Sequence, residues 1–362
     1  MTLALQDVTL VVGRDVHIHP TTITLEPGTL NVLLGPTLSG KTSLMRLMAG
    51  LDRPTTGQVM WNNQDVTGVP VQKRNVAMVY QQFINYPAMS VYNNIASPLR
   101  LEGLSDKEID RKVRDTAELM KLTPMLDRRP LELSGGQQQR CALARALVKG
   151  ADLVLLDEPL ANLDYKLREE MRSEIPKFFE ESGAIFVYAT TEPSEALLLG
   201  GKTASLFEGQ VTQFDETLEV YRRPLTATTA RVFSDPPMNF VSVAKAGNKL
   251  LFGEGQNVAA FGKLSTLEDG RYIAGFRPNH LLLEKPEGHF LSFGVEVTVS
   301  EITGSESFVH VIHDDDRWVS LVHGVHEPEI GSQIKVHINP AHLYVFDENE
   351  NLVAAPEIAV AA

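Results

Sequence analysis

A glycine-rich segment with one lysine and a final threonine lies between the apolar run Leu30–Leu34 and a helical pattern. It reads Gly35, Pro36, Thr37, Leu38, Ser39, Gly40, Lys41 and Thr42. Backbone N–H groups of such a loop, with the positive end of the following helix, can surround phosphate oxygens. Lys41 would place its charge on the β- and γ-phosphates of a nucleotide, and the Thr42 hydroxyl would bind Mg²⁺. The preceding strand and following helix argue against the alternative, a plain turn with a surface lysine.

Two acids end a second apolar run. Leu153–Leu156 is followed directly by Asp157 and Glu158, and a parallel sheet would place both carboxylates at the edge where a nucleotide lies. We expect Asp157 to hold Mg²⁺ and Glu158 to orient the attacking water. An acid pair after a strand is common, so this assignment depends on its occurrence together with the phosphate-binding loop.

A third segment combines helix capping with two glycines. It reads Ser134, Gly135, Gly136 and Gln137. Ser134 and Gln137 have the spacing of a capping box, and the glycines would leave the helix N-terminus open to an anion. The residues alone are also those of an ordinary capped helix.

The elements that must position these residues follow an α/β pattern. The short apolar runs Leu30–Leu34, Leu153–Leu156 and Ile185–Ala189 predict strands buried on both faces of a parallel sheet covered by helices. A capping box at Ser105 and Glu108 opens an amphipathic helix within a helical subdomain at about 85–135. We therefore expect an α/β P-loop NTPase domain at residues 1–235.

A second, all-β domain is expected at residues 240–362. Its predicted strands alternate valine-rich with polar positions, as in Val295–Val299, Phe308–Ile312 and Gln333–Ile338. Two prolines within Asp235–Asn239 disfavour a helix and remove backbone donors, so this stretch is the predicted linker.

Composition narrows the class of protein. The formal net charge is −13, which argues against a general nucleic-acid binder. The single cysteine, Cys141, cannot form an internal disulfide, and no Cys/His spacing suggests a zinc site. We find neither a signal peptide nor an apolar run of the roughly 18 residues needed to cross a bilayer. A cytosolic protein is the expectation.

With Leu133 before Ser134, the third segment resembles the signature motif of the ATP-binding cassette (ABC) ATPases, and the resemblance covers nearly the whole chain. Gln81 matches the family's Q-loop glutamine, which senses the γ-phosphate and is expected at the Mg²⁺ site. Leu160–Asp164 matches the D-loop. The resemblance implies that the signature closes on ATP and Mg²⁺ held by the phosphate-binding loop of a second ATPase subunit.

The sugar- and polyol-importing branch is the most similar. Gly275–Pro278 and Ile302–Glu306 resemble parts of its C-terminal TOBE domain, a small OB-like β-barrel. Tyr80–Pro87 and Tyr188–Pro193, with the phosphate-binding loop, resemble the ATPases of bacterial glycerol importers. The resemblance implies an ATP hydrolase at the cytoplasmic face of the bacterial inner membrane. Its expected partners are a second ATPase, two transmembrane permease subunits and, indirectly, a periplasmic solute-binding protein, with no nucleic acid.

Two positions depart from the family pattern. Thr191 stands where the family has a switch histidine, and an uncharged hydroxyl should stabilise the transferring phosphoryl group less well. In a homodimer both sites would lack the histidine, so a non-identical partner subunit is favoured. The family's adenine-stacking aromatic is also missing near Val12, and His17 and His19 nearby are more simply structural.

Alternative functions stay open. Thr191 is compatible with a regulatory subunit that binds ATP but hydrolyses little of it. Glu158 and Lys41 argue against that function. The solute could also be glycerol-3-phosphate or another sugar. A non-transport ABC protein acting on DNA or ribosomes is disfavoured by the acidic total and by the lack of long coiled coils or a second cassette.

Overall fold

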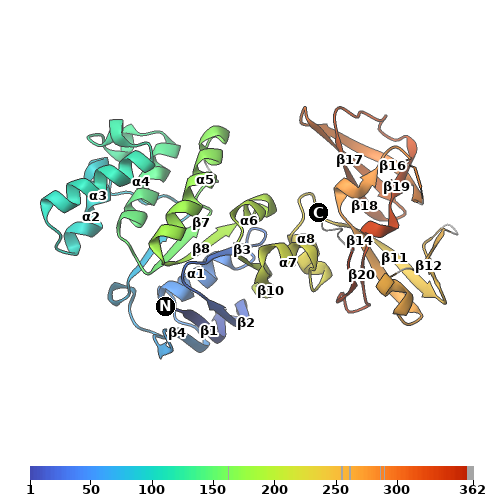
Figure 1. Ribbon diagram of the computed structural model, residues 1–362, viewed down its shortest axis with the longest axis horizontal. Coiled ribbons are helices and arrows are strands. Elements are labelled where there is room, and N and C mark those ends of the chain that lie inside the picture. The colour runs from blue at the N-terminus through green and yellow to red at the C-terminus, as the bar shows by residue number, and fades with distance from the viewer. Residues whose placement is uncertain (162, 254–255, 261, 286, 289, 357–362) are drawn as a thin grey trace. The chain divides into compact units, whose positions relative to one another are not determined.

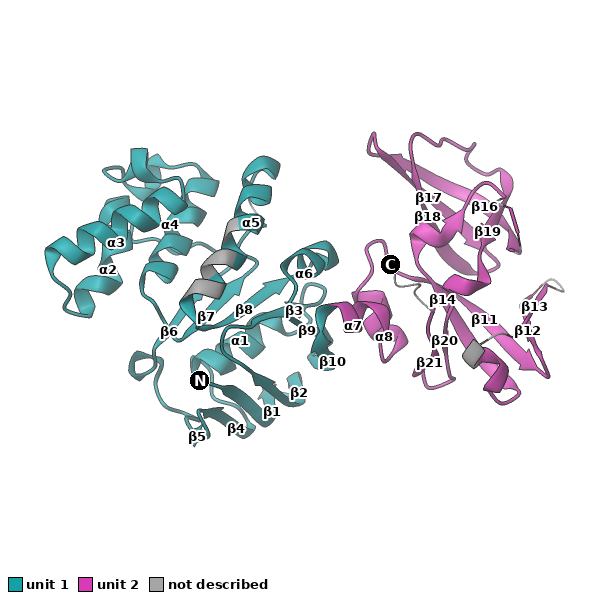
Figure 2. Cartoon of the chain, viewed as in Figure 1, with its two compact units in different colours: residues 1–217 teal, residues 218–362 magenta. Residues whose placement is uncertain are grey.

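The computed structural model describes residues 1–362 except 162, 254–255, 261, 286, 289 and 357–362 (Figure 1). The chain divides into two compact units, residues 1–217 and 218–362 (Figure 2). Among the described residues, no helix is long and apolar enough to cross a membrane.

A six-stranded sheet forms the centre of the first unit, in the order β10-β9-β3-β8-β7-β6. The strands are β3 (Leu30–Leu34), β6 (Val76–Val79), β7 (Leu153–Asp157), β8 (Ile185–Thr190), β9 (Lys202–Phe207) and β10 (Gln210–Glu216). All pairs are parallel except β9 with β10. Every residue of β3, β7 and β8 is buried, which confirms the prediction of strands covered on both faces.

An antiparallel sheet of four strands, in the order β2-β1-β4-β5, completes the base of this unit. Its strands are β1 (Leu3–Val12), β2 (Asp15–Leu25), β4 (Thr56–Trp61) and β5 (Gln64–Asp65). Helix α1 (Lys41–Ala49) follows β3 and buries Leu44, Leu47 and Met48. These residues share one apolar core with both sheets.

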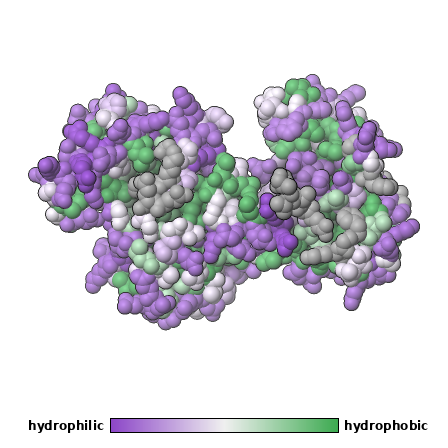
Figure 3. All heavy atoms as spheres, viewed as in Figure 1, coloured by the Kyte–Doolittle hydropathy of each residue, from purple (hydrophilic) through white to green (hydrophobic). Residues whose placement is uncertain are grey.

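The helical part contains α2 (Val91–Leu101), α3 (Asp106–Leu119) and α4 (Gly135–Val148). Both hydrogen bonds of the Ser105–Glu108 capping box are present, and α3 buries Ile109, Val113 and Ala117. Its remaining face is hydrophilic, as Figure 3 shows over α2 and α3. Two further helices, α5 (Tyr165–Ser182) and α6 (Pro193–Leu199), flank β8 in sequence.

The second unit contains two sheets, in the orders β13-β12-β11-β14-β20-β21 and β15-β19-β16-β17-β18. The strands are β11 (Asn239–Ala246), β12 (Lys249–Leu251), β13 (Asn257–Ala259), β14 (Gly270–Phe276), β15 (Leu281–Leu282), β16 (Leu291–Ile302), β17 (Glu306–His313), β18 (Asp316–His323), β19 (Gln333–Ile338), β20 (Tyr344–Phe346) and β21 (Leu352–Ala354). Phe276, Phe293 and Trp318 pack edge to face in their common core. This small all-β fold confirms the predicted class.

Two short helices precede these strands, α7 (Thr217–Arg222) and α8 (Ala227–Val232). Ala227 and Ala230 of α8 pack against Met238, Tyr344 and Phe346 in a small apolar cluster. The compact division therefore falls at Thr217, upstream of the Asp235–Asn239 stretch. The domain limits of 1–235 and 240–362 stay a sequence-based prediction.

Candidate nucleotide-binding site

The phosphate-binding loop lies between β3 and α1, with Gly40 as the helix N-cap at φ 101°. A Cβ atom at Gly35 would lie 2.3 Å from the Leu206 carbonyl oxygen, and one at Gly40 would lie 2.9 Å from Ile18 Cδ1. Only glycine fits both positions. Leu38 has a positive φ of 68° and an exposed side chain, so its backbone is strained while its side chain is free of the core.

A cavity of about 480 Å³ opens beside this loop. It is lined by Asp15, Val16, His17, Thr37, Leu38, Ser39, Gly40, Lys41, Thr42, Ser43, Gln81, Glu158, Glu208 and Gly209. The structure thus brings Gln81 and Glu158 to the loop, as the sequence predicts for one nucleotide site. Gly35 and Pro36 lie just behind it, since their carbonyl oxygens accept from the Lys41 ammonium.

Lys41 is held inside its own loop. Its Nζ donates to the Gly35 oxygen at 2.7 Å and to the Pro36 oxygen at 3.0 Å, and lies 3.8 Å from Glu158 Oε1. Burial lowers the pKa of Lys41, although the nearby Glu158 and Asp157 oppose that effect. A buried ammonium satisfied by carbonyls of a short loop can exchange those partners for phosphate oxygens with little rearrangement.

The two acids stand at the end of β7. Asp157 Oδ2 accepts a hydrogen bond from Thr42 Oγ1 at 2.6 Å, and Glu158 Oε2 accepts one from Gln81 Nε2 at 2.9 Å. Burial raises the pKa of both carboxyls, while Lys41 opposes that rise in each case. Burial thus disfavours the charged form of both carboxyls, and a cation in the site would stabilise that form.

Mg²⁺ prefers oxygen ligands and is usually held by one or two protein groups plus substrate phosphates. The Thr42 hydroxyl, the Asp157 carboxylate and the Gln81 amide oxygen are such donors, and the first two already touch. Among the described residues no cluster of three or more His, Cys, Asp or Glu could hold a metal by itself. The donor set therefore fits Mg²⁺ bound together with nucleotide phosphates.

The signature segment forms the N-terminus of α4. Ser134 Oγ accepts from Gln137 N at 3.4 Å, and Gln137 Oε1 accepts from Ser134 N at 2.9 Å, so the capping box is present. A Cβ atom at Gly135 would meet nothing within 4 Å, and one at Gly136 would meet only Leu163 Cδ2. These four residues do not line the cavity of their own chain. They form an open helix end available to another molecule.

Thr191 follows β8 directly and is exposed. It does not line the cavity. Beside it lies a network that the sequence reasoning missed: buried Glu195 accepts from Thr190 Oγ1 at 2.7 Å and from the Tyr188 hydroxyl at 3.1 Å. Arg172 pairs with Glu195 at 3.2 Å. In the sequence, the position of Glu195 as the third residue of the Pro-initiated segment could have indicated this network. Its hydrogen bonds and ion pair form a fixed framework next to Thr191 in the chain.

The cavity lining also includes Asp15, Val16, His17 and Glu208. The sequence reasoning singled out only His17 among them, and favoured a structural role for it. Val12, where the family has an aromatic residue, is exposed and lies outside the lining. Within the D-loop match, Asn162 lies outside the described residues.

Comparison with known proteins identifies the family. Residues 18–161 match the ABC transporter family, and residues 274–346 match the TOBE domain. The chain is 34% identical to the sn-glycerol-3-phosphate import ATP-binding protein UgpC of Cupriavidus pinatubonensis, over 91% of this chain and 92% of that protein. It is also 34% identical to the trehalose/maltose import ATP-binding protein MalK of Thermococcus litoralis, over 95% and 97%.

A solved structure extends the likeness to three dimensions. A dimeric ATP-binding cassette in a post-hydrolysis state, bound to ADP and Pi, superposes with a TM-score of 0.55 at 27% identity. The match covers 59% of this chain and 98% of that one. With a phosphate-binding loop, paired acids and an open signature helix in place, the chain belongs to the ATP-hydrolysing, ATP-binding subunits of ABC transporters.

Proposed function

We propose that the chain couples ATP binding and hydrolysis to the uptake of a small polyol or sugar, with glycerol as the first candidate. The single observation that supports this most is the meeting of Lys41, Gln81 and Glu158 in one cavity. Relatives named for import of sn-glycerol-3-phosphate and of trehalose/maltose support the solute class. The residues of the motifs, which resemble those of glycerol importers, favour glycerol over its phosphate ester.

The resting contacts suggest how the site engages ATP. Lys41 would leave the Gly35 and Pro36 carbonyls for the β- and γ-phosphates. Thr42, Asp157 and Gln81 would hold Mg²⁺, which neutralises phosphate charge. Gln81 must then release Glu158, to which it now donates a hydrogen bond, and the freed carboxylate can orient the attacking water. The movement of Gln81 would thus signal bound nucleotide to the helical part and, at the same time, free Glu158 for catalysis.

The open signature needs a second subunit. Ser134, Gly135, Gly136 and Gln137 lie outside their own chain's cavity, so we propose that they close on a nucleotide held by a partner ATPase. Thr191 lacks the charge of a histidine, and its neighbours Thr190 and Glu195 are already bonded to each other. We therefore propose a non-identical partner whose histidine serves one of two sites. Two permease subunits, and indirectly a periplasmic solute-binding protein, would complete the complex at the cytoplasmic face of the inner membrane.

The competing proposal is a regulatory subunit that binds ATP with little turnover. Thr191 favours it, because its site would lack a cation beside the transferring phosphoryl group. The complete set of Lys41, Asp157 and Glu158 favours turnover instead.

One experiment separates these proposals. The chain is coexpressed with the products of neighbouring genes, purified in detergent, and the copurifying ATPases are identified by mass spectrometry. The complex is then placed in proteoliposomes for single-turnover ATP hydrolysis and for uptake of labelled glycerol and labelled glycerol-3-phosphate. Glycerol uptake with an unlike second ATPase is the expected result.

Three other results would change the proposed solute, the proposed partner or the proposed role of the chain. Uptake of glycerol-3-phosphate alone would replace the solute. Full transport with this chain as the only ATPase would remove the heterodimer. The regulatory alternative would be established if transport is abolished by replacing the lysine in the partner's phosphate-binding loop but is unchanged by Lys41→Ala.

A further inference from the structure

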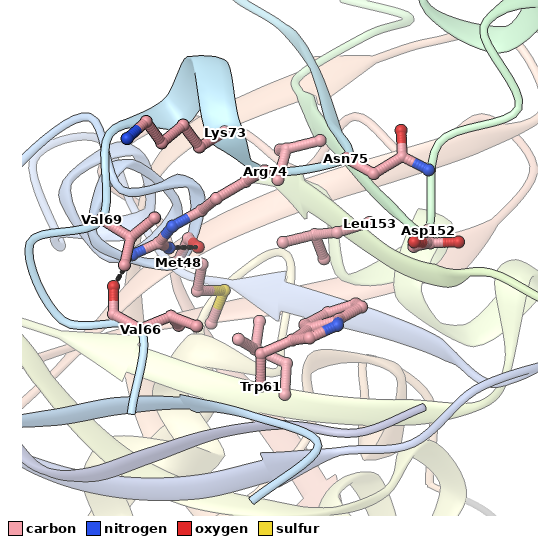
Figure 4. Close-up of a pocket in the computed structure, with 11 residues that line it drawn as sticks. Met48, Trp61, Val66, Val69, Lys73, Arg74, Asn75, Asp152 and Leu153 are labelled. Atoms are coloured by element: carbon pink, nitrogen blue, oxygen red, sulfur yellow. Dashed lines mark hydrogen bonds between the residues drawn. The ribbon is translucent and has the colours of Figure 1, made fainter. Parts of the chain in front are cut away.

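A second cavity, of about 150 Å³, lies in the first unit (Figure 4), and its lining includes no residue of the phosphate-binding loop. Its lining consists of apolar side chains and a polar rim: Leu3, Met48, Trp61, Val66, Val69, Lys73, Arg74, Asn75, Val76, Asp152 and Leu153. Cavities of about this size, lined by apolar groups, admit a single benzene-sized ring. A ligand of roughly that bulk would fit.

Arg74 gives the cavity its charge. Its Nη1 donates to the Met48 carbonyl oxygen at 3.1 Å and its Nη2 donates to that of Val66, while Nε is buried without a partner. Burial lowers the pKa of Arg74, and no carboxylate among the described residues forms an ion pair with it. A half-buried cation satisfied only by carbonyls still lacks a counter-ion.

The backbone makes room for this guanidinium. Gly50 follows α1 with φ 75°, and a Cβ atom there would lie 2.5 Å from Arg74 Cζ. Any other residue at position 50 would push the guanidinium away from its two carbonyls. The chain therefore fixes Arg74 against the C-terminal end of α1, at the wall of the cavity (Figure 4).

The other polar groups define what the ligand carries. Trp61 is half-buried and presents its indole to the cavity, as Figure 4 shows. Lys73 adds a positive charge at the rim, and Asp152 adds one negative charge on the far side from Arg74. Two cations against one carboxylate leave a net positive rim over an apolar, partly aromatic interior. That combination suits an anionic head on a flat apolar body.

We propose that this cavity is a binding site for a small aromatic monocarboxylate, with its carboxylate at Arg74 and its ring beside Trp61. Three elements line the cavity near one of their ends: Met48 lies one residue before the end of α1, β6 begins at Val76 and β7 begins at Leu153. Lys41 begins α1, Asp157 ends β7 and Gln81 follows β6 by two residues, all in or beside the nucleotide site. A bound anion would thus act on both strands and the helix that hold the catalytic groups, and so alter ATP affinity.

The two tryptophans of the chain provide the test, because Trp61 lines the cavity and Trp318 lies in the core of the other unit. The full chain is labelled with 5-fluorotryptophan and titrated with benzoate, benzamide and benzylammonium while ¹⁹F NMR spectra are recorded. We expect benzoate to shift the Trp61 resonance saturably and leave that of Trp318 in place. Benzamide should bind about tenfold more weakly, since it lacks the charge, and benzylammonium should not bind.

Variants locate the site. Arg74→Gln should reduce benzoate affinity to that of benzamide, and Val69→Phe, which fills the cavity, should abolish binding of both. Arg111→Gln, on the exposed side of α3, is the matched control and should change nothing. Should Arg74→Gln fail to fold, Val69→Phe decides. The proposal is overturned by an unmoved Trp61 resonance, by equal affinities for benzoate and benzamide, or by binding that survives Val69→Phe.

The link to the nucleotide site has its own readout. ATP affinity of the full chain is measured with and without saturating benzoate, and a change of about threefold or more is expected. An unchanged ATP affinity with benzoate bound would leave a binding site without coupling and would overturn the effector role.

Discussion

Lys41 and Arg277 are equally buried cations, each with 5% of its surface exposed, yet they are held in different ways. Lys41 bonds two carbonyls of its own loop and approaches Glu158. Arg277 bonds the carbonyls of Phe233 and Tyr221, and its guanidinium lies 3.7 Å from the Tyr221 ring centroid. Lys41 thus has local partners that it can exchange, whereas Arg277 ties separate segments of the second unit together.

Removing Lys41 should have the largest effect on activity and little effect on folding. Lys41→Ala should lower ATP hydrolysis by the purified complex about 10³-fold, because the γ-phosphate loses its cation. The urea midpoint of the chain should hardly move, since removal of the buried ammonium leaves two carbonyls that can form other hydrogen bonds. Lys107→Ala on α3 is the control. A large loss of stability in Lys41→Ala would make Lys41 a structural cation like Arg277.

Glu158→Gln should reduce hydrolysis by about 10²–10³-fold while ATP binding is retained. The amide oxygen can still accept from Gln81, so that only the charge that orients water is lost. Single-turnover hydrolysis and nucleotide binding are measured on the same preparation. Unchanged hydrolysis would assign the water-orienting role to another group.

Arg277→Met should act on stability and leave ATP binding intact. Loss of two hydrogen bonds and the stacked guanidinium should cost about 2–3 kcal/mol, measured by urea unfolding of the full chain. Arg271→Met, on the exposed end of β14, is the matched control. If ATP affinity falls with Arg277→Met, the contrast with Lys41 fails.

Thr191→His should raise hydrolysis by the complex about tenfold, since a cation returns beside the phosphoryl group. Thr190→Val tests the framework, because it removes the hydrogen bond to Glu195 without adding a charge, and it should slow hydrolysis. Both are read as kcat at saturating ATP. A Thr191→His complex no faster than wild type would mean that the partner already supplies every histidine the reaction uses.

The smallest expected effect is a gain in stability from Asp157→Asn. Burial raises the pKa of Asp157 in the folded chain, so folding is favoured by its protonated form: this contribution is complete below the unfolded pKa and is lost as pH rises through the folded pKa. At neutral pH the ionised group therefore opposes folding. Without nucleotide, the variant should be more stable by about 1 kcal/mol, and the difference should shrink in acid. Equal stability of the variant and the wild type at neutral pH and in acid would contradict this prediction.

Local patterns in the sequence were sufficient for much of the site. The capping boxes at Ser105 and Ser134 form as their spacing predicts, because a box is made within one helical turn. Buried strands such as Leu30–Leu34 could also be predicted, since a short apolar run between polar segments is compatible with few other structures. Arg277 falls within the segment Gly275–Pro278 that resembles the TOBE domain, but only the structure shows that its side chain connects separate segments.

The sequence by itself determined the phosphate-binding loop, the acid pair after β7 and the all-β character of the second unit, since each depends on residues close together in the chain. The tertiary structure alone decided which distant groups meet. Thr42 and Asp157 are 115 residues apart, and Gln81 and Glu158 are 77 apart. The ion pair of Arg172 with Glu195, 23 residues apart, and the cavity at Arg74 are of the same kind. Such contacts depend on how strands and helices pack, which no local spacing encodes.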